Sequence, residues 1–179
     1  MALFNFEREF SPKSNLVASQ AAEQSVDQQR RDVYESHRHR AFSLAFYMTG
    51  NELEAEEILA NTFVRAFQQN ERPDGFAVDC ALVAELNKRF DLQQEEPAAV
   101  PSPGTGLHRN VRRPDLEVAV RNLPSIERLL FLLRDVEGYT PAMIGRLLDM
   151  PEAKVQRTCF SARIRLYQGL AEQDQTEAA

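Results

Sequence analysis

The chain has 179 residues, a formal net charge of −6 at pH 7 and 43% hydrophobic residues. Such a length accommodates one or two small domains. No apolar run approaches the ~20 residues of a membrane span, and charges interrupt the N-terminus before a signal-peptide core can form, so we predict a cytoplasmic protein without a membrane span.

The N-terminal part of the sequence predicts a tail followed by a long helix. Residues 1–24 lack a sustained apolar pattern, so we expect them to form a mobile tail. A long amphipathic helix is expected to follow, ending near Thr49. Gly50 favours this end because glycine adopts the left-handed conformation at little cost. The apolar residues that indicate the helix are Val33, Phe42, Ala45, Phe46 and Met48.

Two further helices complete a first helical domain, predicted over residues 25–92. Asn51 is a typical N-cap residue, and acidic residues occupy the first turn of the helix after it. Pro73-Asp74-Gly75 predicts a turn, and a third helix is expected over about residues 78–90. The second helix carries a broad apolar face made of Ala55, Ile58, Leu59, Thr62, Phe63, Ala66 and Phe67.

Residues 93–115 have the composition of a linker. They read QQEEPAAVPSPGTGLHRNVRRPD, in which Pro, Gly, Ser and charged residues dominate and no apolar period survives. Such a segment is flexible, and it is extended where proline is dense. It separates the first domain from a second helical region.

The segment from Leu123 to Leu170 predicts three helices separated by two breaks. The first helix is expected over about residues 124–136 and ends at Gly138. Thr140-Pro141 begins a short second helix, because threonine is a good N-cap and proline suits the first turn. Asp149-Met150-Pro151 predicts a tight turn before the third helix. We therefore predict a helix-turn-helix domain over residues 116–170 and a tail over residues 171–179, in an all-α protein.

The third helix combines an apolar face with a basic stripe. Val155, Cys159, Ala162 and Leu166 share one face, and Lys154, Arg157, Ser161 and Arg165 lie beside it. Between Tyr139 and Leu170 five basic residues stand against two acidic ones, a local charge of +3 in an acidic chain. Ordinary solvated arginines on a helical bundle would also explain this charge. The short helix, tight turn and basic helix together favour binding of a helix in the DNA major groove.

Little in the sequence indicates catalysis or metal binding. His37 and His39 are two residues apart, so they do not share a helix face. Cys80 and Cys159 lack a CxxC spacing, and Cys159 is expected to be a buried apolar residue. Without a phosphate-binding loop, nucleophile elbow or catalytic triad, we expect neither an enzyme nor a cofactor.

The two blocks together resemble the extracytoplasmic-function (ECF) sigma factors of the sigma-70 family, bacterial transcription initiation subunits with two helical domains and a flexible linker. The resemblance to region 2 rests on Tyr34, Ala45, Gly50, Ala55-Glu56-Glu57-Ile58-Leu59, Thr62-Phe63 and Ala66-Phe67. The resemblance to region 4 rests on Leu123-Pro124, Arg128, the run FLLRDVEGYT from Phe131, Ile144, Pro151, Val155, Ala162-Arg163 and Leu166.

The resemblance implies partners and site residues. Region 2 would bind the β′ clamp of core RNA polymerase through Glu56, Glu57, Leu59, Ala60 and Phe63. It would bind the −10 promoter element through Asn87, Lys88, Arg89 and Asp91. Region 4 would bind the β flap, and would contact the −35 element through Lys154, Gln156, Arg157, Thr158, Ser161, Arg163 and Arg165. Promoter DNA is the implied ligand, and an anti-sigma factor is a further candidate partner.

The first block departs from the family pattern, which leaves a second interpretation open. Ala60 replaces a usual Gln, Cys80-Ala81 a usual Trp-Leu, and Leu92-Gln93 a usual Arg pair. From Asp32 to Leu92 eleven acidic residues stand against six basic ones, whereas single-stranded DNA favours a positive groove with aromatic platforms. The alternative is a sigma-like protein that binds polymerase or an anti-sigma factor without melting a promoter. A regulator that binds DNA through the second block alone would leave the first block unexplained.

Overall fold

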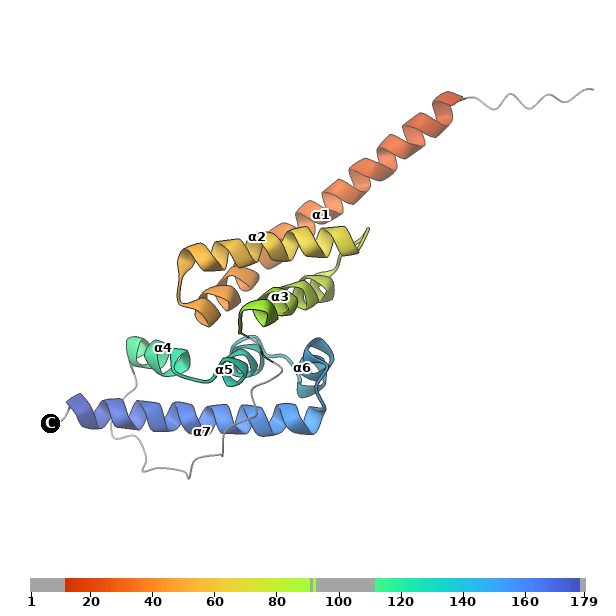
Figure 1. Cartoon of the computed structure of the whole chain (residues 1–179). Coiled ribbons are helices and arrows are strands. Elements are labelled where there is room, and N and C mark those ends of the chain that lie inside the picture. The colour runs from red at the N-terminus through yellow and green to blue at the C-terminus, as the bar shows by residue number, and fades with distance from the viewer. Residues whose placement is uncertain (1–11, 91, 93–111, 178–179) are drawn as a thin grey trace, which may run out of the picture.

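A computed structural model describes residues 12–90, 92 and 112–177, and the side chains of residues 24–90, 92 and 112–172. The described residues form seven α-helices and one π-helical turn, without a strand, in two packed helical units (Figure 1). The predicted all-α fold is confirmed. None of the described helices has the length and apolarity needed to cross a membrane.

The first unit consists of α1 (Pro12–Thr49), α2 (Glu52–Gln69) and α3 (Gly75–Phe90). Gly50 ends α1 with a φ of +69°, a conformation that favours glycine. The Asn51 side chain accepts hydrogen bonds from the backbone N–H groups of Leu53 and Glu54, at 3.0 and 3.3 Å. The break between α1 and α2 therefore follows the turn chemistry expected from the sequence.

The core of the first unit lies where the C-terminal half of α1 packs on α2 and α3. It is built from large apolar side chains that exclude solvent, including Leu44, Met48, Ile58, Phe63, Leu82 and Leu86. Burying each such side chain contributes about 1.5–3 kcal/mol. This core fixes the outward faces of α2 and α3.

The second unit consists of α4 (Arg113–Arg121), α5 (Ser125–Phe131), the π-helical turn η1 (Leu132–Val136), α6 (Pro141–Leu148) and α7 (Glu152–Glu177). Thr140 caps α6 by accepting a hydrogen bond from the Met143 N–H at 3.2 Å. In Figure 1, α7 forms a long base under α4, α5 and α6. The predicted helix over 124–136 is present, with a π-helical last turn.

Three segment boundaries differ from the prediction. Helix α1 begins at Pro12, so residues 12–24 are helical and not a tail. Proline suits a first turn, and the segment contains three Ala and two Gln, which form helices readily. Residues 113–115 belong to α4, and α7 continues to Glu177. The rest of the predicted linker, residues 93–111, and residues 1–11 lie outside the described residues.

The two units are in direct contact. Helix α5 lies against α1, and α6 lies against α3. Arg128 of α5 donates a hydrogen bond to the Met48 carbonyl of α1 at 2.6 Å, and the Arg146 guanidinium of α6 lies 5.0 Å from the centre of the Phe76 ring of α3. The seam between the units therefore contains specific polar contacts.

Candidate nucleic-acid interface

The outer face of the first turns of α7 is the strongest candidate for DNA contact. Gln156 and Arg157 are exposed, and Lys154 is half-buried beside them. Neither Lys154 nor Arg157 forms an ion pair with another described residue, so both charges face solvent. The face thus presents positive charge and an amide, the groups that contact phosphates and base edges.

The turn between α6 and α7 holds the two helices close together. Asp149 ends α6 in the left-handed conformation, with φ 51° and ψ 47°. A Cβ atom added at Gly145 would lie 2.7 Å from the Met150 carbonyl oxygen, so only glycine fits there without a shift of the backbone. This close approach gives α7 a fixed direction relative to α6, as a groove-binding helix requires.

Two of the seven predicted −35 residues point into the protein, contrary to the prediction. Thr158 and Ser161 are each 1% exposed. The Thr158 hydroxyl donates to the Lys154 carbonyl at 2.9 Å, and the Ser161 hydroxyl donates to Glu127 at 2.8 Å. The buried face of α7 is therefore broader than the apolar pattern suggested, and these hydroxyls stabilise the fold of the unit.

Two other predicted residues are held by carboxylates. Arg165 forms an ion pair with the fully buried Glu127 of α5, with Nε 3.1 Å from Oε2. Arg163 pairs with Asp135 of η1, its Nε lying 3.2 Å from Oδ2. Arg163 remains largely exposed, whereas Arg165 serves mainly to neutralise Glu127, because a buried carboxylate is costly without a partner.

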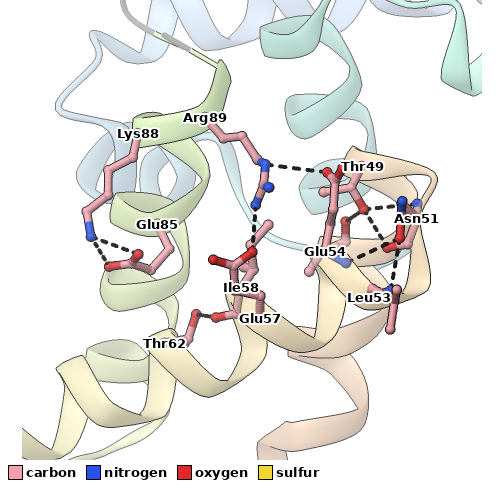
Figure 2. A network of polar contacts seen from close by, with 11 residues as sticks. Thr49, Asn51, Leu53, Glu54, Glu57, Ile58, Thr62, Glu85, Lys88 and Arg89 are labelled. Atoms are coloured by element: carbon pink, nitrogen blue, oxygen red, sulfur yellow. Dashed lines mark hydrogen bonds and ion pairs between the residues drawn. The ribbon is translucent and has the colours of Figure 1, made fainter.

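The predicted −10 residues on α3 are surrounded by acids. Arg89 lies 3.4 Å from Glu54 and 3.6 Å from Glu57 of α2, and Lys88 Nζ lies 2.7 Å from Glu85, as Figure 2 shows. Burial alone would raise the pKa of Glu85, but the hydrogen bonds from Lys88 and Arg65 outweigh it and lower that pKa. The net effect is a face with little free positive charge.

Asn87 and Asp91 complete the predicted −10 set. The Asn87 side chain accepts a hydrogen bond from the Leu92 N–H at 3.0 Å, which caps the end of α3. Asn87 also lines a cavity of about 220 Å³ at the seam, opposite Leu147 and Met150 of the second unit. Asp91 lies outside the described residues.

The predicted polymerase-binding residues divide into outward and inward positions. Glu56, Glu57 and Ala60 are exposed on α2, and Leu59 is half-buried. Phe63 is 5% exposed and contacts Tyr34 of α1 with ring centres 4.8 Å apart, so its ring belongs to the core. Two apolar residues that the sequence analysis did not single out, Leu53 and Val64, are exposed along the same helix.

A second apolar surface lies between α4 and η1. It is a hollow lined largely by Tyr47, Leu116, Val120, Phe131, Leu132 and Val136. Val136 is 58% exposed at its edge. Apolar area left open in this way is typical of surfaces that bind another protein.

A buried polar network joins the two units, and the sequence analysis did not predict it. Arg40 of α1 pairs with Asp79 of α3, and Tyr139, in the loop before α6, bonds to both. Burial raises the pKa of Asp79 despite these partners. Burial, together with the bond to Asp79, raises the pKa of Tyr139 to about 12.

The described residues contain no cluster of His, Cys, Asp or Glu that could hold a metal ion. Cys159 is buried, as predicted, and burial raises the pKa of its thiol. Cys80 is exposed and free.

Comparison with known proteins agrees with this geometry. Residues 113–166, which span α4 to the middle of α7, match the family model for sigma-70, region 4. The ECF RNA polymerase sigma factor SigE of Mycolicibacterium smegmatis is 26% identical over 176 residues, which cover 89% of this chain and 68% of that protein. The resemblance to ECF sigma factors that the sequence predicted is therefore confirmed.

Proposed function

We propose that this relative of the ECF sigma factors is itself a sigma factor, which works in the cytoplasm and directs RNA polymerase to a subset of promoters. The observation that carries the proposal is the outward face of α7, where Lys154, Gln156 and Arg157 extend from a fixed helix-turn-helix inside the region 4 match. Phosphate contacts from Lys and Arg supply affinity, and base-edge contacts supply sequence preference.

For the −35 element we assign base-edge contacts to Gln156 and Arg157, and phosphate contacts to Lys154 and Arg163. Arginine binds guanine and glutamine binds adenine through paired hydrogen bonds in the major groove. Thr158, Ser161 and Arg165 are left out, because their side chains are buried or are paired with Glu127.

For the polymerase we assign one surface on each unit. The exposed face of α2, with Leu53, Ala60 and Val64 beside Glu56 and Glu57, supports docking on the β′ clamp. The apolar hollow between α4 and η1 supports docking on the β flap. Both surfaces combine exposed apolar atoms with a rim of charge, as transient protein interfaces do.

The alternative is a sigma-like protein that binds polymerase or an anti-sigma factor without melting DNA. The observation that favours it is the pairing of Lys88 and Arg89 with Glu85, Glu54 and Glu57. Promoter melting needs positive and aromatic groups that hold single-stranded bases. Region 2 of this chain offers little of the positive charge, since eleven acidic residues stand against six basic ones from Asp32 to Leu92.

Run-off transcription with core polymerase and the full chain distinguishes the two functions. Templates are selected from genomic DNA by the reconstituted holoenzyme, and the products are mapped at their 5′ ends. A sigma factor gives defined start sites that disappear when the chain is omitted. A complex that forms with polymerase but gives no defined product from any selected template supports the alternative, and failure to bind polymerase would contradict both.

A further inference from the structure

The side chain of Phe160 extends into solvent from the outer face of α7. It is 61% exposed, the highest value for an aromatic residue among the side chains that the structure describes. Its sequence neighbours Cys159 and Ser161 are buried, so the ring points away from the core. Exposed single apolar residues are common, but this ring lies in the middle of the face assigned above to DNA.

Phe160 shares a shallow hollow with three residues of that face. The hollow is lined by Ala153, Gln156, Arg157 and Phe160. Their spacing of three and four residues places them on one side of the helix, over a length of about 10 Å at 1.5 Å per residue. At ~3.4 Å per base step, this length matches about three base pairs.

The chemistry of the four residues fits the edges of bases in the major groove. Arg157 suits guanine and Gln156 suits adenine. Both side chains bind through hydrogen bonds, so neither of them recognises an apolar group on a base. The apolar group that the major groove offers is the C5-methyl of thymine, which phenylalanine and alanine side chains contact. A phenyl ring beside a methyl group removes apolar area from water on both sides.

We propose that Phe160 reads thymine in the element bound by α7, by packing its ring against the C5-methyl group, next to the bases contacted by Gln156 and Arg157. The inference rests on the proposed function, because it needs α7 in the major groove. It adds a specificity-determining residue and the base that this residue selects.

Replacing thymine by uracil in the DNA tests the contact directly, because uracil lacks only the methyl group. The probe is a duplex of the strongest site that the holoenzyme selects from a random DNA pool, with uracil substituted at one thymine at a time. We expect one position at which the wild-type holoenzyme loses about fourfold in affinity, the equivalent of one buried methyl group. Phe160→Ala should bind the unmodified site less tightly and should be insensitive to uracil at that position.

Tyr167→Ala is the matched control, since Tyr167 is an exposed aromatic residue of the same helix, 49% exposed, two turns beyond Phe160. It should keep the wild-type sensitivity to uracil. If specific DNA binding occurs but no uracil substitution weakens it in the wild type, the thymine contact is wrong and the sigma function stands. If Phe160→Ala weakens binding to core polymerase and leaves the uracil effect intact, the ring contacts protein, which also overturns the inference. Failure of the holoenzyme to select any site would instead contradict the proposed function.

Discussion

Tyr139 donates its hydroxyl hydrogen to Asp79 across the seam between the two helical units, although sixty residues separate them in the sequence. Arg40 donates to both of these groups from α1. The network therefore ties the loop before α6 to two helices of the first unit. Because Asp79 and Tyr139 are buried and Arg40 is half-buried, the loss of any one leaves the others with an unmet hydrogen bond.

Tyr139→Phe should destabilise the chain. The ring still fills its place, but Asp79 loses a donor and Arg40 loses an acceptor, which costs about 1–3 kcal/mol for buried polar groups. Urea denaturation followed by circular dichroism measures the change in the free energy of unfolding. Tyr167→Phe removes a hydroxyl from an exposed residue and should change nothing. Equal midpoints for the two variants would mean that the network does not stabilise the fold.

The same contact predicts a loss of stability at high pH. The pKa of Tyr139 is about 12 in the folded chain against 10.0 for an ordinary tyrosine, so between these values the folded chain holds a proton that the unfolded chain has released. The free energy of unfolding should therefore fall as pH rises from 10 to 12. Absorbance of the tyrosinate form should show one of the tyrosines titrating late, and Tyr139→Phe should abolish that late step.

Local turn chemistry made much of the fold predictable, because each turn depends on residues next to one another. Asn51 caps α2, Thr140 caps α6 and Gly138 takes the left-handed conformation, as expected, and Asp149 lies in the predicted tight turn. Helix α4 was missed because it has only nine residues and begins inside a Pro- and charge-rich segment, whose composition masks a short helix.

The candidate site was less predictable, because it depends on tertiary packing. Ser161 and Arg165 lie in the expected basic stripe of α7, but α5 brings the buried Glu127 against this edge of the helix. The Asp79–Tyr139 contact joins distant segments and leaves no periodic trace in the sequence. Phe160 did leave a signal in the sequence, because it is an aromatic residue on the polar side of a basic helix. The predicted site residues did not include it.

Glu54→Gln should increase the affinity of the first helical unit for single-stranded DNA, if this unit binds the −10 element as proposed. The change removes one of the two carboxylates near Arg89 and frees part of its charge. Because exposed ion pairs contribute about 0–1 kcal/mol, the gain should stay below roughly fivefold. Fluorescence anisotropy of a labelled −10 strand with the holoenzyme measures it. Glu35→Gln removes the same charge beside Arg38 on α1 and should give no gain; equal gains would indicate a general charge effect.

Ala60→Arg should weaken binding to core polymerase. Ala60 is exposed on the α2 face assigned to the clamp. An arginine there would be buried without a partner when polymerase binds, at a cost on the order of 1–3 kcal/mol, or about tenfold in affinity. Gln69→Arg is the control. It adds the same side chain nine residues farther along α2, on the opposite side of the helix, at a residue that is also exposed. Titration of labelled polymerase with each variant compares the two. Equal affinities would exclude this face of α2 as the contact.

Arg157→Ala should weaken binding to the −35 element and relax its sequence preference. Arg157 is exposed and has no ion-pair partner among the described residues, so its guanidinium is available to a base edge, a contact that discriminates by about 1–3 kcal/mol. Arg163→Ala is the control on the same helix, because Arg163 is paired with Asp135 and is assigned to a phosphate. Loss of the Arg163 side chain should weaken binding to all DNA sequences alike. It should also lower the number of counterions released on binding by about one. Footprints of both variants on the selected site and on a scrambled duplex separate the two effects. If Arg157→Ala lowers affinity equally for both duplexes, Arg157 contacts phosphate, and the base preference must come from other residues of the α7 face.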